Sequence, residues 1–122
     1  MANDFKRFTV SSVNTSVGAS ASAVYTVPAG AGSTALESIV IGITLANKTS
    51  TGVTASVFLD NFSGSNDVYI VKDATIPAGS SLEVMSGNKI VVQGNGSAND
   101  VIRVSSGTAT AVDATISVLE DV

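Results

Sequence analysis

Apolar and polar residues alternate along this chain with the two-residue period of β-strands. In one segment, the alternate positions that share a face are Ile39, Ile41, Ile43 and Leu45. A second segment places on a single face Val112, Ala114, Ile116 and Val118. Because successive side chains of a strand point to opposite faces of a sheet, each segment predicts one buried face and one small or polar face. Leu119 breaks the second alternation and is expected on the outside.

Nine short strands are predicted between clusters of Gly, Asn and Ser that recur about every eight to twelve residues. Their ranges are 5–10, 21–27, 36–45, 53–59, 68–72, 81–85, 89–93, 101–105 and 111–119. This spacing is typical of two packed antiparallel sheets. The sequence therefore predicts an all-β fold in a single domain over residues 1–122. We expect an antiparallel β-sandwich, immunoglobulin-like or jelly-roll-like, of about eight or nine short strands.

The composition supports strands and is consistent with binding to other proteins. The chain has 18 Val, 8 Ile and 12 Thr but 5 Leu, and β-branched side chains favour strands over helices. Charged residues make up 13% of the chain, against about 25% in typical soluble domains. Since the cores of interfaces are depleted of charge, this value fits a surface partly covered by partners. A solvated face rich in Ser and Thr explains it equally well.

The net charge and the missing residue types argue against several functions. A net charge of −4 disfavours nucleic-acid binding. The chain has no Cys and no His, so it lacks the usual zinc ligands and any His-based acid–base pair. The one Ser-x-x-Lys spacing, from Ser86 to Lys89, lies in a predicted Gly-Asn turn and not in a recognisable catalytic context, and we expect neither an enzyme nor a cofactor. The oxygen-rich segment 60–67 is more typical of an exposed loop than of a calcium site, whose ligand spacing it lacks.

No targeting or membrane segment is expected. The first residues lack the apolar run of a signal peptide. The longest apolar stretch, around residues 39–46, is far shorter than the ~20 residues of a membrane helix. The sequence thus predicts synthesis in a cytoplasm and no contact with a membrane.

Two proline-containing turns are predicted, at Val27-Pro28-Ala29-Gly30 and at Ile76-Pro77-Ala78-Gly79. In each, Pro fits the second position of a β-turn and Gly the fourth. This is the pattern preferred by type I turns.

The candidate partner contacts lie near the N-terminus and in one loop. The N-terminal set combines two of the four Phe with a basic pair and consists of Phe5, Lys6, Arg7 and Phe8. Residues 1–20 are predicted either as an extended arm that reaches a neighbouring subunit or as a first strand followed by a long loop. Phe62 is expected either to face a partner or to anchor its own loop. Tyr25 and Tyr69 are expected to be half-buried, with their hydroxyls at the rim.

Several segments together resemble a known family. They are Met1–Thr9, Val24–Gly30, Ile41–Asn47, Val68–Ala74, Ile76–Glu83 and Ile116–Glu120. In these segments, which span nearly the whole chain, the sequence resembles the small virion structural proteins of tailed phages, notably those of cyanobacteria and marine bacteria. The shared motifs are strand and turn signatures, so they indicate a family without specifying a role.

The resemblance implies a β-sandwich attached to a phage particle. The expected function is that of a capsid decoration or cement protein that stabilises the head, bound to the major capsid protein or other virion proteins. The resemblance also implies location in the virion, and a homo-oligomer, with a trimer favoured. A tail, neck or baseplate accessory protein is the alternative within the virion. A free-standing sugar-binding or adhesin module is the alternative from another class, and the scarcity of aromatic residues counts against it.

Overall fold

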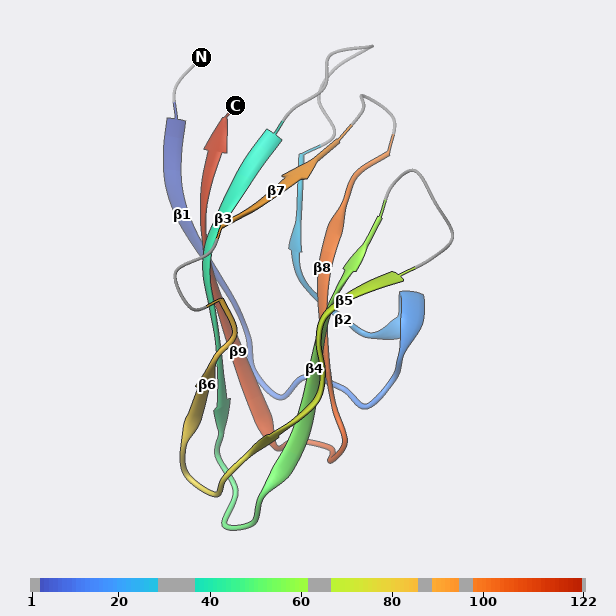
Figure 1. Ribbon diagram of the computed structural model, residues 1–122, viewed down its shortest axis with the longest axis vertical. Helices are drawn as coiled ribbons and strands as arrows, with labels where there is room; N and C mark the ends of the chain where they lie inside the picture. Colours follow the sequence, from blue (N-terminus) through green and yellow to red (C-terminus); the bar gives the residue numbers. More distant parts are fainter. Residues whose placement is uncertain (1–2, 29–36, 62–66, 86–88, 95–97, 122) are drawn as a thin grey trace.

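The computed structural model describes residues 3–28, 37–61, 67–85, 89–94 and 98–121 and shows two packed antiparallel sheets (Figure 1). The strands are β1 (Asn3–Val10), β2 (Ser22–Thr26), β3 (Glu37–Asn47), β4 (Val53–Asp60), β5 (Asp67–Ile76), β6 (Ser81–Glu83), β7 (Ile90–Gln93), β8 (Val101–Ser106) and β9 (Val112–Asp121). A 3-10 turn, η1 (Gly18–Ser20), lies between β1 and β2. The predicted all-β sandwich and its nine strands are confirmed. The largest difference in bounds is at β5, which continues to Ile76.

The strands form one sheet of five and one sheet of four. Sheet A has the order β1-β9-β3-β6, with β7 also paired to β3. Sheet B has the order β2-β8-β4-β5. Strands β6 and β7 share one edge of β3, because β7 pairs with Glu37–Val40 and β6 with Thr44–Ala46. They therefore act as one interrupted strand.

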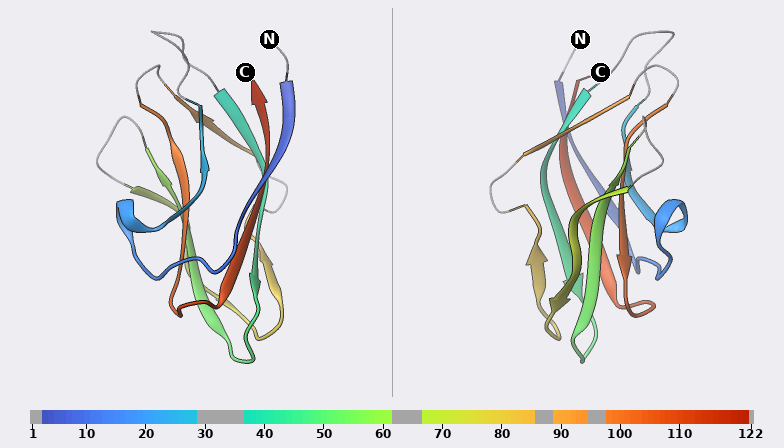
Figure 2. Two further views of the ribbon diagram at one scale, coloured as in Figure 1. Left: turned by 180° about the vertical axis from the view of Figure 1, so that it is seen from behind. Right: turned by 45° about the vertical axis from the view of Figure 1, so that its right-hand side comes forward.

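The chain is a long hairpin rolled into two layers. Its first arm pairs with its second arm in the order β1 with β9, β2 with β8, β3 with β7 and β6, and β4 with β5. Successive pairs fall in alternate sheets, and further pairings of β9 with β3 and of β8 with β4 close the layers. This is the eight-strand arrangement of a jelly roll, the second of the two predicted sandwich types. Both chain ends consequently lie at one end of the sandwich (Figure 2).

A β-bulge in β3 changes which of its residues face the core. Val40 pairs with Val118 and Gly42 with Ser117, so Ile41 is an extra residue. Before the bulge Val40 is buried, and after it Ile43 is buried. The expected single buried face from Ile39 to Leu45 is therefore wrong in its first half, because an inserted residue shifts the two-residue period by one. Ile39 is partly exposed and Ile41 is 37% exposed.

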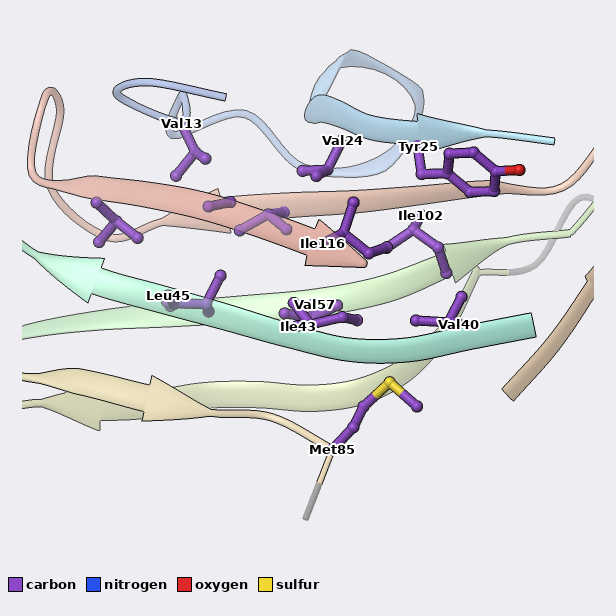
Figure 3. Packing of buried hydrophobic residues seen from close by; sticks show 14 of the residues in the cluster. Val13, Val24, Tyr25, Val40, Ile43, Leu45, Val57, Met85, Ile102 and Ile116 are labelled. Atoms are coloured by element: carbon purple, nitrogen blue, oxygen red, sulfur yellow. The ribbon is translucent and has the colours of Figure 1, made fainter. Parts of the chain in front are cut away.

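The core lies between the two sheets and consists mainly of β-branched aliphatic side chains. Figure 3 shows ten of its members by name: Val13, Val24, Tyr25, Val40, Ile43, Leu45, Val57, Met85, Ile102 and Ile116. The buried alternation predicted for Val112 to Val118 is confirmed. Tyr25 lies at one end of this cluster with its hydroxyl turned away from the aliphatic side chains (Figure 3).

A buried asparagine joins two turns at the opposite end of the sandwich from the chain termini. The Nδ2 of Asn47, which is 2% exposed, donates to the carbonyls of Thr51, Ile76 and Pro77 at 2.8–3.2 Å. Its Oδ1 accepts from the amide and the hydroxyl of Thr49. The side chain of Asn47 points inward because, after the bulge, the alternate residues Ile43, Leu45 and Asn47 share the core-facing side of β3.

The turn after β5 differs from the prediction. The amide of Ser80 donates to the carbonyl of Pro77 at 3.1 Å, so Pro77 is the first residue of the turn and not the second. Gly79 is the third residue and has a φ of +67°. A positive φ at this position belongs to type II turns, in which Gly is favoured there. The other proline turn, at residues 27–30, lies partly outside the described residues.

Replacement of two isoleucines of β3 by Ala tests the phase that the bulge sets. Ile43→Ala removes a fully buried side chain and is expected to lower the free energy of unfolding by about 2–5 kcal/mol. Ile41→Ala makes the same change on an exposed side chain and is expected to cost less than about 1 kcal/mol. Urea unfolding of both variants measures the difference. Equal losses would contradict the assigned phase.

Candidate functional site

The outward face of sheet A carries a continuous row of apolar side chains across four strands. Phe5 of β1 pairs with Leu119 of β9, Leu119 pairs with Ile39 of β3, and Ile39 pairs with Val91 of β7. Directly paired residues point to the same face of a sheet. The face is the outer one, because Val118 and Val40, the neighbours of Leu119 and Ile39, are buried in the core. We call Phe5, Leu119, Ile39 and Val91 the apolar row.

The apolar row is exposed to solvent and bordered by polar residues. Phe5 is 78% exposed and Val91 is 60% exposed, while Leu119 and Ile39 are partly exposed. Exposed Glu37 and Gln93 pair with each other on the side toward the chain ends. Exposed Arg7 and Ser117 pair on the other side. An apolar strip with a polar rim is the composition of a protein–protein contact surface.

A buried carboxylate lies directly behind this row and joins three strands. Glu120 of β9 is 3% exposed. Its Oε2 accepts a hydrogen bond from the Tyr25 hydroxyl of β2 at 2.5 Å. Since that hydroxyl donates to Glu120, the Ser38 hydroxyl of β3 must donate to it, at 2.9 Å. Tyr25 thereby connects sheet B to two strands of sheet A.

The same carboxylate holds the first strand. Its Oε1 is buried, and among the described residues its partner is the Lys6 ammonium of β1, at 3.0 Å. The contact with Glu120 raises the pKa of Lys6 above its ordinary value of 10.5. Burial, followed by the hydrogen bond to Glu120, raises the pKa of Tyr25 well above 10.0. Both groups are thus held in the protonation state that satisfies the carboxylate.

The structure divides the N-terminal candidate residues between two faces of β1. Phe5 and Arg7 point outward and are exposed. Lys6 forms an ion pair with Glu120, and Phe8 packs on Tyr25 with ring centroids 4.9 Å apart. Residues Asn3–Val10 are paired along β9 as a strand of sheet A. Phe62 lies outside the described residues.

The two tyrosines differ from the expectation that both would be half-buried. Tyr25 is 2% exposed and makes the hydrogen bonds described above, whereas Tyr69 is 45% exposed. Tyr69 lies on the outward face of β5, with its ring centroid 5.5 Å from that of Phe58. Both tyrosines lie on edge strands of sheet B. They differ because Tyr25 points into the core between the sheets, whereas Tyr69 points outward.

Signals for the remaining residues of the site are present in the sequence. Glu120 continues the buried even-numbered series of β9, which places a carboxylate in the core phase. Adjacent residues of a strand point to opposite faces of the sheet. Consecutive apolar residues, such as Val91-Val92 and Ile39-Val40-Ile41, therefore place some apolar side chains on the outside. Which of them lie side by side depends on the strand order, which local sequence does not specify.

The outward face of sheet B is partly covered by the chain between β1 and β2. The amide of Ser106 donates to the carbonyl of Asn14, at 3.0 Å. Arg103 donates from Nη1 to the carbonyl of Ala21, at 2.9 Å, and from Nε to Asp60, at 2.8 Å. Phe58, on the same outward face, is 1% exposed. The connection with η1 runs across this side of the molecule (Figure 2).

A polar pocket of about 320 Å³ remains between this connection and β5. Its lining residues come from four segments and are Thr15, Val17, Ser56, Tyr69, Lys72, Asp73, Ser105, Ser106 and Gly107. Ser56 of β4 and Ser105 of β8 are paired in the sheet and point outward into it. Gly107 allows the end of β8 to approach β4, because a Cβ there would lie 2.4 Å from the Thr54 hydroxyl.

Within the described ranges, no three acidic side chains come together in a group that could hold a metal ion. No helix in this part of the chain is long and apolar enough to cross a membrane.

The sequence matches no protein-family model. It also matches no curated protein.

Tyr25→Phe tests the buried hydrogen bonds behind the apolar row. The variant leaves Oε2 of Glu120 and the Ser38 hydroxyl without their partner, and we expect the free energy of unfolding to fall by about 1.5–3 kcal/mol. Tyr69→Phe removes an exposed hydroxyl and serves as the matched control, with an expected change below about 0.5 kcal/mol. Urea unfolding at neutral pH measures both. A loss no larger in Tyr25→Phe than in the control would contradict the assigned role.

The same pair of variants makes a pH prediction. Because the folded-state pKa of Tyr25 lies above 10.0, its contribution to stability is complete below pH 10 and is lost as the pH rises above that value. The raised pKa of Lys6 acts in the same direction above pH 10.5. We expect Tyr25→Phe to lose stability less steeply than the parent between pH 10 and 11.5, by up to about 1.4 kcal/mol per pH unit. Parallel curves would contradict this.

Proposed function

We propose that this protein is a structural component of a bacteriophage particle, a decoration or cement protein bound to the head, and that the apolar row is its docking face. The observation that carries the proposal is the exposed row from Phe5 to Val91. In this function the protein acts by binding other virion proteins and performs no chemistry. The resemblance of its strand and turn motifs to small virion proteins of tailed phages supports the same assignment.

The position of the row fits a rigid docking surface. Its four side chains lie on paired strands, and Glu120, Tyr25 and Lys6 fix two of those strands from behind. Preorganised surfaces lose little conformational entropy on binding. The jelly roll adds a fold-level analogy, because viral capsid proteins and lectins both use it, and this analogy does not choose between them.

The size of the row favours several copies acting together. At about 4.8 Å between strands, three spacings give a strip of roughly 15 Å. A stable pairwise interface needs about 800 Å² on each partner, so one such strip with its rim makes a weak contact. A homo-oligomer, with a trimer favoured, would bind a shell through several weak contacts at high effective concentration. Binding that is specific for the assembled shell stabilises the shell in proportion to occupancy.

A tail, neck or baseplate accessory protein is the alternative within the virion. It would use the same face and the same physical mechanism on a different partner. The two differ in copy number, since a head protein is needed across the shell and an accessory protein at one end of it.

The docking test compares binding of variants to purified particles that lack this protein. Phe5→Ser/Val91→Ser removes the two most exposed members of the row and is expected to weaken binding at least about tenfold, since a few anchor residues, aromatic ones among them, carry most of the binding energy of an interface. Val68→Ser is the matched control, because Val68 is 52% exposed on sheet B. Co-sedimentation with particles at a series of protein concentrations gives the affinities.

Both variants should unfold at the same urea concentration as the parent protein, since they change exposed side chains. Loss of binding in the row variant with retention in Val68→Ser is the expected result. Equal binding by both variants would exclude the row as the docking face. Failure of the parent protein itself to bind heads or tails would reject the virion assignment.

A further inference from the structure

The polar pocket on sheet B lies on the opposite side of the molecule from the apolar row, and the proposed docking function does not use it. Its floor is formed by Ser56 and Ser105, which are paired across β4 and β8 and are each 6% exposed. Its walls come from Thr15 and Val17 on one side and from β5 on the other. A volume of about 320 Å³ lies at the lower end of the range for small-molecule sites.

One hydroxyl of the floor is available to a ligand. Ser105 is more than nine-tenths buried, and no hydrogen bond of its side chain is found within the described part of the chain. Among the described residues only Oε1 of Glu120 is a buried side-chain oxygen without a hydrogen-bond partner. The Ser105 hydroxyl is therefore open to the pocket it lines, where an occupant could bond it in place of water. The hydroxyl of Ser56, by contrast, is bonded to Asp73, from whose amide it accepts at 2.9 Å.

Asp73 is held in a conformation that aims it at this floor. Its φ is 50°, in the left-handed region, and it lies at an irregularity in the pairing of β4 with β5. The Ser56 hydroxyl donates to Oδ1 of Asp73 at 3.3 Å. Residues outside the common backbone regions are enriched at ligand sites. The arrangement leaves the second carboxylate oxygen, Oδ2, for an occupant.

The charges of the pocket favour a neutral ligand. Lys72 and Asp73 are both exposed in the lining and carry opposite charges, so the pocket has no net charge. The buried part of the lining offers hydroxyl groups. Lys72 Nζ lies 5.6 Å from the ring centroid of Tyr69, so this cation is already placed against the ring. Hydroxyl donors and acceptors, one carboxylate and one aromatic edge are complementary to a neutral molecule that carries several hydroxyls on a compact ring.

We infer that this pocket binds a single ring of a neutral saccharide. Asp73 and Ser105 would hydrogen-bond adjacent ring hydroxyls, and the edge of the Tyr69 ring would contact the carbon atoms of the sugar. With one ring enclosed and one side open to water, binding on the order of a millimolar dissociation constant is expected. The site does not depend on the virion assignment, since the row and the pocket lie on different sheets.

The test is a titration of the ¹⁵N-labelled full chain with neutral methyl hexosides, followed by amide chemical shifts. The expected result is saturable shifts at the amides of Ser56, Asp73 and Ser105 for at least one hexoside. Glucuronate, glucosamine and glycine, added separately, test the requirement for a neutral ring. If an oligosaccharide binds more tightly than a single ring, the natural ligand is a ring within a glycan. Equal binding of the two would identify a free sugar as the ligand.

Two pocket variants have matched controls elsewhere. Asp73→Asn, which keeps a residue that tolerates positive φ, and Ser105→Ala are each expected to weaken binding about tenfold. Asp4→Asn and Ser117→Ala change exposed side chains of sheet A and should leave it unchanged. No shifts up to 50 mM of any hexoside, shifts confined to residues outside the pocket, or preferential binding of the charged compounds would each overturn the proposal.

Discussion

The register of β3 is the constraint on which the rest of this structure depends. This strand lies inside sheet A, paired with β9 along one side and with β7 and β6 in turn along the other. The extra residue Ile41 allows Val40 to be buried before the bulge and Ile43 after it. A strand without the bulge would have to turn one half of these side chains away from the core.

The same inserted residue determines what lies on the two surfaces of the strand. On the inner side it brings Asn47 to the position where its amide joins the turns at Thr51 and Pro77. On the outer side it leaves Ile39 beside Leu119, which completes the apolar row. The core and the proposed docking face are therefore two consequences of one backbone irregularity. Bulges commonly occur where a strand must re-aim a side chain.

The two sheets differ in how their outer faces are treated. Sheet B is covered in part by the connection that holds Ala21 against Arg103, and the cover leaves a polar pocket. The outward side chains of sheet A remain exposed or partly exposed, and some of them are large and apolar. An exposed apolar strip costs solubility unless a partner covers it. This asymmetry is the physical basis for proposing assembly at sheet A and ligand binding at sheet B.

Local sequence was sufficient for the strands and for the buried face of β9. Period-two alternation and turn residues located all nine strands, because these signals act within a few residues. The phase of β3 could not be predicted, since the bulge forms through its pairing with Val118 and Ser117 on a distant strand. The apolar row depends on the order β1-β9-β3-β7, and the pocket combines four separate segments. Glu120 was detectable in principle, because it continues the buried phase of β9.

The most direct test of the central claim is the copy number of this chain relative to the major shell protein in purified phage particles, measured by quantitative mass spectrometry. A decoration protein that docks across the head predicts a ratio approaching one to one. A ratio of a few per cent would contradict the head assignment and place the protein in the tail or neck. Absence from the particles would contradict the virion function altogether.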